Sequence, residues 1–221
     1  VSLETPLALR APCPSSAARQ CWGEDLPLPA FGGDPAEGRH RLARLAKRGL
    51  RPVRARSAVT CAGVLNGRID AGLSKVVHNL ETFERLLVDA RGGVGNDLHA
   101  ICGMVGGIRS YRTYVRRFDP AAMEVVEESR RAARYRVPGI GEVAFEVAAD
   151  DRHLPVAMAS MLGKYVRELG MERQNRFYRR ADPDLPRASG YHDPVTRRFV
   201  EGTASLRRRL RIAPDCFERR R

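Results

Sequence analysis

Two adjacent carboxylates, Asp150 and Asp151, are the residues in this sequence that are best placed for chemistry. They follow an alternating stretch that predicts a β-strand, and Pro155 marks the start of a strongly periodic helix just after them. Carboxylates at a strand end can bind Mg²⁺. Acids before a helix can also simply complement its dipole or cap it, so the spacing alone leaves both interpretations open.

The helix after this acidic pair carries a hydroxyl and two cations on one face. Ser160, Lys164 and Arg167 stand at positions i, i+4 and i+7, which a helix brings to the same side. Donors of this kind can hold phosphate. Lysine and arginine on a helix are also often only solvated, so this pattern too has a structural alternative.

The elements that must position these residues alternate along the chain. We expect residues 1–40 to be an irregular arm and residues 181–194 to be a loop. Strands are expected at residues 53–64, 98–105, 135–137 and 142–149. Helices are expected at residues 40–50, 71–90, 120–134, 155–178 and 195–210. This order predicts an α/β domain with a mixed sheet.

The charge of the chain favours a polyanionic partner without requiring one. Lys+Arg is 39 against Asp+Glu 26, which gives a formal net charge of +13, and only Lys47, Lys75 and Lys164 are lysines. The planar fork of arginine suits phosphate groups. Proteins rich in Ala, Arg and Gly from GC-rich genomes are also often basic without binding nucleic acid.

The cysteines and the hydropathy indicate a reduced cytoplasmic protein. The five cysteines are scattered and form no C-x-x-C pair, which argues against a disulfide framework or structural zinc. Cys61 and Cys102 lie in apolar runs and are interpreted as structural. We find no membrane-spanning apolar run and no signal peptide. Because the first residue is Val1, the sequence may be interpreted as a fragment or a processed product.

Residues 150–169 resemble a segment of ribonuclease HII (type 2 ribonuclease H), in which a metal-binding acid precedes an Ala/Ser-rich helix. By this resemblance Asp150 takes the place of the last catalytic acid and metal ligand, with Asp151 as its neighbour if the register shifts by one. Ser160, Lys164 and Arg167 then match the substrate-binding helix motif, while Glu168 stands where the family commonly has Asp.

A second stretch, residues 188–196, resembles the G-S-G-Y-x-S-D-P-x-T loop of archaeal and eukaryotic type 2 enzymes. The resemblance implies that Ser189, Gly190 and Tyr191 bind substrate, with the ring of Tyr191 stacking at the ribonucleotide–deoxyribonucleotide junction. The 2′-hydroxyl at such a junction is the group that separates RNA from DNA. Taken alone, this stretch is also ordinary turn chemistry.

A looser match indicates that one of the family's catalytic acids is missing from this sequence. Residues 106–111 resemble a Gly-Gly-Arg and Tyr segment of bacterial relatives, which puts the third catalytic acid near Gly103. The sequence has no acid there, and Asp97 is at the wrong end of the strand. The family's Asp-Glu-Ala-Gly opening segment is also missing, since Glu24 and Asp25 follow no strand.

The resemblance as a whole implies a ribonuclease H-like mixed sheet flanked by helices, with its front strand or strands missing. The expected organisation is an arm (1–40), the α/β domain (41–180), and a junction-recognition loop with a basic carboxy-terminal helix packed on the same domain (181–221). The expected phosphate contacts are Arg207, Arg208, Arg209 and Arg211.

Two functions follow from these expectations. The first is a protein that acts on RNA–DNA hybrid or on a ribonucleotide-containing duplex by Mg²⁺- or Mn²⁺-dependent hydrolysis, weak or lost because the acid set is incomplete. The alternative is a non-catalytic nucleic-acid-binding module on the same fold.

Overall fold

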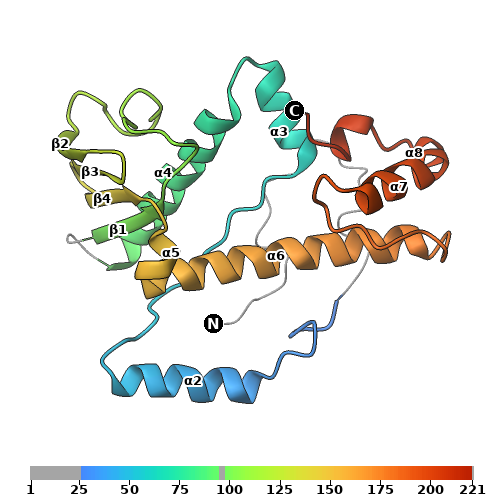
Figure 1. Ribbon diagram of the computed structural model, residues 1–221, viewed down its shortest axis with the longest axis horizontal. Coiled ribbons are helices and arrows are strands. Elements are labelled where there is room, and N and C mark those ends of the chain that lie inside the picture. Colours follow the sequence, from blue (N-terminus) through green and yellow to red (C-terminus); the bar gives the residue numbers. More distant parts are fainter. Residues whose placement is uncertain (1–25, 95–97, 221) are drawn as a thin grey trace. The chain divides into compact units, whose positions relative to one another are not determined.

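The computed structural model (Figure 1) describes residues 26–94 and 98–220. These residues fall into two compact units. Of these residues, unit 1 contains 53–94, 98–163 and 219–220. Unit 2 contains 26–52 and 164–218. The two units therefore alternate along the chain, and the expected domain boundaries at residues 40 and 180 remain a prediction.

Unit 1 contains a four-stranded mixed sheet. Its strands are β1 (Leu98–Gly103), β2 (Glu124–Glu128), β3 (Ala132–Val137) and β4 (Gly141–Glu146), in the spatial order β1-β4-β3-β2. β1 runs parallel to β4, whereas β2, β3 and β4 form an antiparallel meander. The alternation of apolar and polar residues in β3 and β4 puts one row of side chains in the core and the other on the opposite face.

Helices flank this sheet. Unit 1 contains α3 (Ala62–Asp70), α4 (Lys75–Val94) and the short α5 (Ala149–Arg152), and α4 and α5 both pack on β1. α6 (Leu154–Arg179) begins in unit 1 and continues into unit 2. The expected α/β class with a mixed sheet is confirmed, and the arrangement is consistent with a ribonuclease H-like fold.

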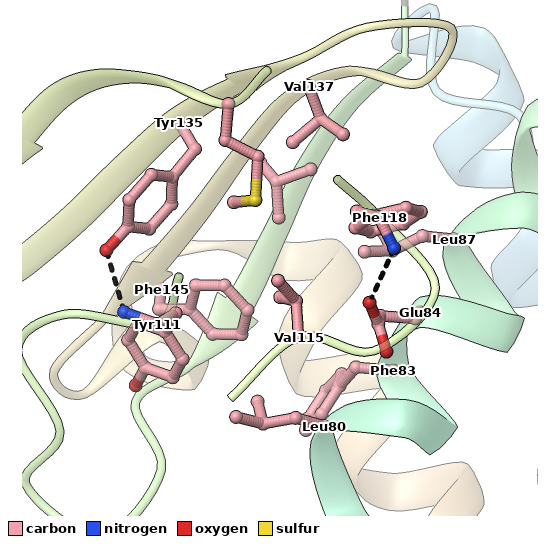
Figure 2. A pocket seen from close by; sticks show the side chains of 12 residues that line it. Leu80, Phe83, Glu84, Leu87, Tyr111, Val115, Phe118, Tyr135, Val137 and Phe145 are labelled. Atoms are coloured by element: carbon pink, nitrogen blue, oxygen red, sulfur yellow. Dashed lines mark hydrogen bonds between the residues drawn. The ribbon is translucent and has the colours of Figure 1, made fainter. Parts of the chain in front are cut away.

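The core of unit 1 is aromatic (Figure 2). The ring of Tyr111 stacks on that of Phe145 with centroids 3.8 Å apart, and its backbone N–H donates to the Tyr135 hydroxyl at 2.9 Å. Tyr111 and Tyr135 are both fully buried. Burial raises the pKa of Tyr135 to about 12, and a hydrogen bond to Glu128 adds to the rise. Buried hydroxyls with partners of this kind are structural.

Unit 2 is helical. It contains α2 (Pro35–Lys47), the second part of α6, α7 (Pro194–Gly202), α8 (Ala204–Arg209) and the 3₁₀ turn η2 (Pro214–Cys216). Its core is a separate aromatic cluster that includes Tyr178, Phe199 and Phe217.

Two of the expected elements are wrong. Residues 53–64 form no strand, because the Cys61 sulfur accepts the Val64 N–H at 3.4 Å and begins α3. Residues 120–134 are not a helix but contain β2 and the start of β3. The Ser129 hydroxyl turns the chain between these strands by binding the N–H groups of Arg131 and Ala132. In both segments, hydrogen bonds between a side chain and the nearby backbone determine the local structure.

Three other elements change only in extent. The helix expected at residues 71–90 is α4, which runs from Lys75 to Val94. The helix expected at residues 40–50 begins earlier, at Pro35, because Asp34 caps it. The helix expected at 195–210 divides into α7 and α8 at Thr203. β1, β3, β4 and the long α6 are confirmed at the expected places. No helix of the described residues has the length and apolar character needed to cross a membrane.

Candidate functional site

The end of β1 is the place where the sequence comparison expects a catalytic acid and finds Gly103. In the parallel register Gly103 lies opposite Glu146, the last residue of β4. Register partners on neighbouring strands point to the same face of a sheet. A Cβ added at Gly103 would meet no atom within 4 Å, so the missing side chain leaves open space beside Glu146.

Glu146 is a buried carboxylate that is bound by cationic groups. Its side chain is 5% exposed. Oε1 accepts a hydrogen bond from Arg134 at 3.0 Å, and Oε2 lies 3.0 Å from both Arg152 and His153. The hydrogen bond with His153 is the largest cause that lowers the pKa of Glu146, and the one with Arg134 adds to it. Glu146 is therefore held as an anion by side chains of the protein.

The predicted acids Asp150 and Asp151 lie in the first turn of α5. Both are exposed, and neither forms an ion pair with any of the described residues. Because α5 packs on β1, the structure brings this pair to the same part of unit 1 as Gly103 and Glu146. The assignment of Asp150 as a catalytic residue and metal ligand remains a prediction.

The donor set does not fit a pair of divalent ions. Two-ion phosphodiester hydrolysis requires several carboxylates that share the ions. Among residues 26–94 and 98–220, no group of three or more His, Cys, Asp or Glu side chains could hold a metal ion. Gly103 offers no ligand, and both oxygens of Glu146 are bound to cations. Glu24, Asp25 and Asp97 lie outside the described residues.

On α6, the three predicted substrate-binding residues differ in their surroundings. Ser160 and Lys164 are exposed. Arg167 is engaged within unit 2, since it donates to the Ser189 carbonyl oxygen at 2.8 Å and pairs with the Glu168 carboxylate. Its guanidinium also lies 4.1 Å from the centroid of the Tyr191 ring, within the range of a cation–π contact. Arg167 thus supports the loop that follows α6.

Ser189 and Asp193 fix the predicted recognition loop. The Ser189 hydroxyl binds the Asp193 carboxylate and accepts the Tyr191 N–H at 3.1 Å. Asp193 in turn caps α7 by accepting the Thr196 N–H at 2.7 Å. The hydrogen bond from Ser189 is the largest cause that lowers the pKa of Asp193, so this carboxylate stays ionised as the anchor of the loop.

Gly190 and Tyr191 form the exposed part of the same loop. Gly190 has φ +76°, and a Cβ there would lie 2.5 Å from the Met171 sulfur. A side chain at this position would therefore be both strained and obstructed. Tyr191 is 58% exposed although Arg167 contacts its ring. The loop thus presents an aromatic ring in a fixed position.

Sequence reasoning missed Asn175, which holds the start of this loop. Asn175 is buried within α6, and its side-chain amide exchanges two hydrogen bonds with the Ala188 backbone, at 2.8 and 3.0 Å. A neutral amide in the middle of a long, charged helix was the available signal. Glu146 and His153 were missed as well, because the contacts that bury Glu146 depend on strand register and on α5.

The four carboxy-terminal arginines do not share one environment. Arg207 is buried, donates to the Val200 carbonyl oxygen at 2.8 Å, and stacks 4.1 Å over the Phe217 ring. Its guanidinium is thus part of the core of unit 2. Arg208, Arg209 and Arg211 are exposed, and their contact with phosphate remains a prediction.

The cysteines in the apolar runs have structural surroundings. Burial raises the pKa of the Cys102 thiol to about 12, so it stays protonated at neutral pH. Cys61 caps α3 through its sulfur. A Cys102 thiol with a raised pKa does not provide the activated thiolate that a nucleophilic cysteine requires.

Comparison with known proteins gives one match. The family model described as "Ribonuclease HII" matches residues 103–211, which include the acidic turn of α5, the whole of α6 and the Tyr191 loop. No curated protein and no solved structure matches the chain. Through this segment of about half its length, the chain belongs to the ribonuclease HII family.

Proposed function

We propose that this protein binds RNA–DNA hybrid, or duplex DNA with an embedded ribonucleotide, as a ribonuclease HII-like protein. The observation that carries the proposal is the Tyr191 ring, held over Arg167 and 58% exposed. An exposed aromatic ring can stack on a nucleotide, and contact at the 2′-hydroxyl distinguishes RNA from DNA. Ser189 and Gly190 contribute by fixing the backbone that leads into Tyr191.

The surroundings of the Tyr191 loop support this role. Asp193 and Asn175 hold the loop through hydrogen bonds that are formed without any ligand. A loop that is already ordered loses little conformational entropy on binding. The exposed Lys164, Arg208, Arg209 and Arg211 would add phosphate contacts that do not depend on sequence.

For hydrolysis, this proposal assigns the chain weak or absent activity. The ribonuclease HII family generally depends on divalent metal ions, and we expect Mg²⁺ or Mn²⁺ for any residual activity. Asp150, with Asp151 as its neighbour, is the candidate acid for such chemistry. A single acid cannot hold two ions, and Glu146 is bound by Arg134, Arg152 and His153.

A non-catalytic nucleic-acid-binding module is the second candidate function. The cationic partners of Glu146 favour it, because a divalent ion near that carboxylate would meet guanidinium groups already in place. The two functions share the same binding step and differ only in whether a phosphodiester bond is broken.

One pair of assays separates the two functions. Equilibrium binding is measured with a labelled RNA–DNA hybrid, a duplex with one embedded ribonucleotide and an all-DNA duplex of the same sequence. Cleavage of the first two is then followed in Mg²⁺ and in Mn²⁺. We expect both ribonucleotide-containing substrates to bind more tightly than DNA, with little or no cleavage. Equal binding of all three would contradict the proposed recognition.

Any cleavage that is observed should be tested with Asp150→Asn. The matched control is Asp184→Asn, which removes the same charge from an exposed loop of unit 2. Loss of cleavage in the first variant alone would support Asp150 as the catalytic acid. Unchanged cleavage would show that the active site has been placed wrongly.

A further inference from the structure

The loop between β1 and β2 carries an unusual concentration of arginine. The first fifteen residues of this loop, 104–118, contain Arg109, Arg112, Arg116 and Arg117 and no acidic residue, and Asp119 follows them. Arg109, Arg116 and Arg117 are exposed. None of the four forms an ion pair with a carboxylate in the part of the chain that the structure describes; the Arg116 guanidinium donates to the backbone carbonyl oxygens of Thr113 at 3.0 Å and Val115 at 2.9 Å. We call these fifteen residues the β1–β2 loop.

Four other arginines of unit 1 are paired with carboxylates. Arg54 and Arg56 pair with Asp89, Arg68 with Glu81, and Arg136 with Glu124. In these pairs the positive charge is already balanced by the protein. The β1–β2 loop, in contrast, presents charge that only solvent or a bound anion can balance.

The β1–β2 loop is also firmly anchored. The buried carboxylate of Glu84, on α4, accepts the backbone N–H groups of Arg116 at 3.1 Å, Arg117 at 2.9 Å and Phe118 at 3.1 Å. Figure 2 shows Glu84 reaching the Phe118 nitrogen from the helix below it. The backbone of two exposed arginines is therefore held in place by hydrogen bonds to one buried carboxylate.

Tyr111 provides the second anchor. Its hydroxyl accepts the Val105 N–H at 2.9 Å, while its own N–H binds the Tyr135 hydroxyl, as Figure 2 also shows. The ring is fully buried against Phe145. The loop is therefore ordered by the core, while Arg109, Arg116 and Arg117 are exposed.

From these observations we infer that the β1–β2 loop is a phosphate-binding surface, which contacts the sugar–phosphate backbone of nucleic acid through Arg109, Arg112, Arg116 and Arg117. The inference rests on the proposed function in that the partner is nucleic acid. It assigns to unit 1 a contact separate from the Tyr191 loop and from the carboxy-terminal arginines of unit 2. Because phosphate contacts carry no sequence information, this surface would bind hybrid and DNA alike.

The test is the salt dependence of binding for Arg116→Gln/Arg117→Gln. Each phosphate contact contributes about 0.9 to the slope of log K against log salt for duplex DNA. We expect the double variant to lower this slope by about 1 to 2 and to weaken binding of a labelled DNA duplex and of a labelled hybrid to a similar extent. Arg116→Lys/Arg117→Lys keeps the charge and should retain most of the slope.

The matched control is Arg56→Gln/Arg136→Gln, which removes the same charge from two exposed arginines already paired with Asp89 and Glu124. It should change the slope much less. Equal effects of the two Gln variants would overturn the inference while leaving the proposed function standing, provided that the unchanged protein prefers hybrid. If the unchanged protein binds no nucleic acid, both the inference and the proposed function fail.

Discussion

The end of β4 and the Tyr191 loop each contain a carboxylate that is bound by its neighbours, but the neighbours differ in kind. Glu146 is surrounded by Arg134, Arg152 and His153. Asp193 is bound by the Ser189 hydroxyl and the Thr196 N–H, which are neutral. In the first region charged groups neutralise the acid. In the second, neutral donors bind the carboxylate, and these hydrogen bonds hold the loop in a conformation that leaves Tyr191 exposed.

This difference bears on what each region can do. A carboxylate whose oxygens already bind cations has little capacity left for a divalent ion. A loop held by internal hydrogen bonds can present an aromatic side chain without paying for its ordering at the moment of binding. On the proposed function, the Tyr191 loop is therefore better suited to binding a nucleotide than the end of β4 is to binding a divalent ion. The first predictions below test the sheet and the end of β4, and the last one tests the Tyr191 loop.

The largest effect is expected at Gly141, which begins β4 beside β1. Its φ is +126°, and a Cβ would collide with the backbone of Leu98. Gly141→Ala should therefore lower the free energy of unfolding by about 3 kcal/mol or more. Gly139→Ala, at a positive φ but in open space, is the control and should cost about 1 kcal/mol. Urea unfolding of both variants measures the difference, and equal costs would contradict the observed strand contact.

The next effect concerns Glu146 itself. Glu146→Gln keeps the shape but removes the charge that Arg134 and Arg152 face, so we expect a loss of about 1 to 3 kcal/mol in unfolding free energy. Glu142→Gln is the control on the same strand, since its side chain is more exposed, at 34%. It should change the stability by about 0.5 kcal/mol or less. A Glu146 variant as stable as its control would show that the cationic cluster is weak.

Acidification should reveal the same cluster without mutation. The pKa of Glu146 is lowered from its ordinary value of 4.5, chiefly by the hydrogen bond with His153. A lowered pKa in the folded state contributes stability that is present above the unfolded pKa and lost as the pH falls. The unchanged protein should therefore lose more stability below pH 4.5 than Glu146→Gln does. Parallel losses in urea unfolding at several pH values would contradict this.

The smallest effect is expected at Gly103. Open space surrounds the position of its Cβ, and the neighbouring cations favour an acid there. Gly103→Asp should therefore change the free energy of unfolding by less than about 1 kcal/mol. Gly103→Leu provides a bulkier comparison of the same space. A large loss with Asp would mean that steric constraint, rather than sequence change alone, excludes an acid at this position.

The sequence predicted those parts whose pattern is local and strong. α6 and the alternation of β3 and β4 were found, because hydrophobic periodicity determines them directly. The ordering of the Tyr191 loop could be anticipated from Ser189 and Gly190, whose residue types suit a turn. Two motifs in the expected order within one helix and the loop after it led to the correct family.

The errors arose where a side chain overrides the pattern. Cys61 begins a helix in a stretch that alternates like a strand, and Ser129 turns the chain where a helix was expected. Glu146 was not singled out from the sequence, although Arg134, Arg152 and His153 cover it. These contacts join residues whose pairing depends on strand register and on α5, which sequence periodicity does not specify.

The most direct test of the central claim compares Tyr191→Ala with Asp150→Asn in one binding experiment on a labelled RNA–DNA hybrid. The account predicts that Tyr191→Ala weakens binding by about tenfold or more, with unfolding unchanged, because a stacking contact contributes about 1 to 3 kcal/mol. Asp150→Asn should leave binding unchanged in Mg²⁺. The reverse result, with Mg²⁺-dependent binding that needs Asp150 and not Tyr191, would contradict it.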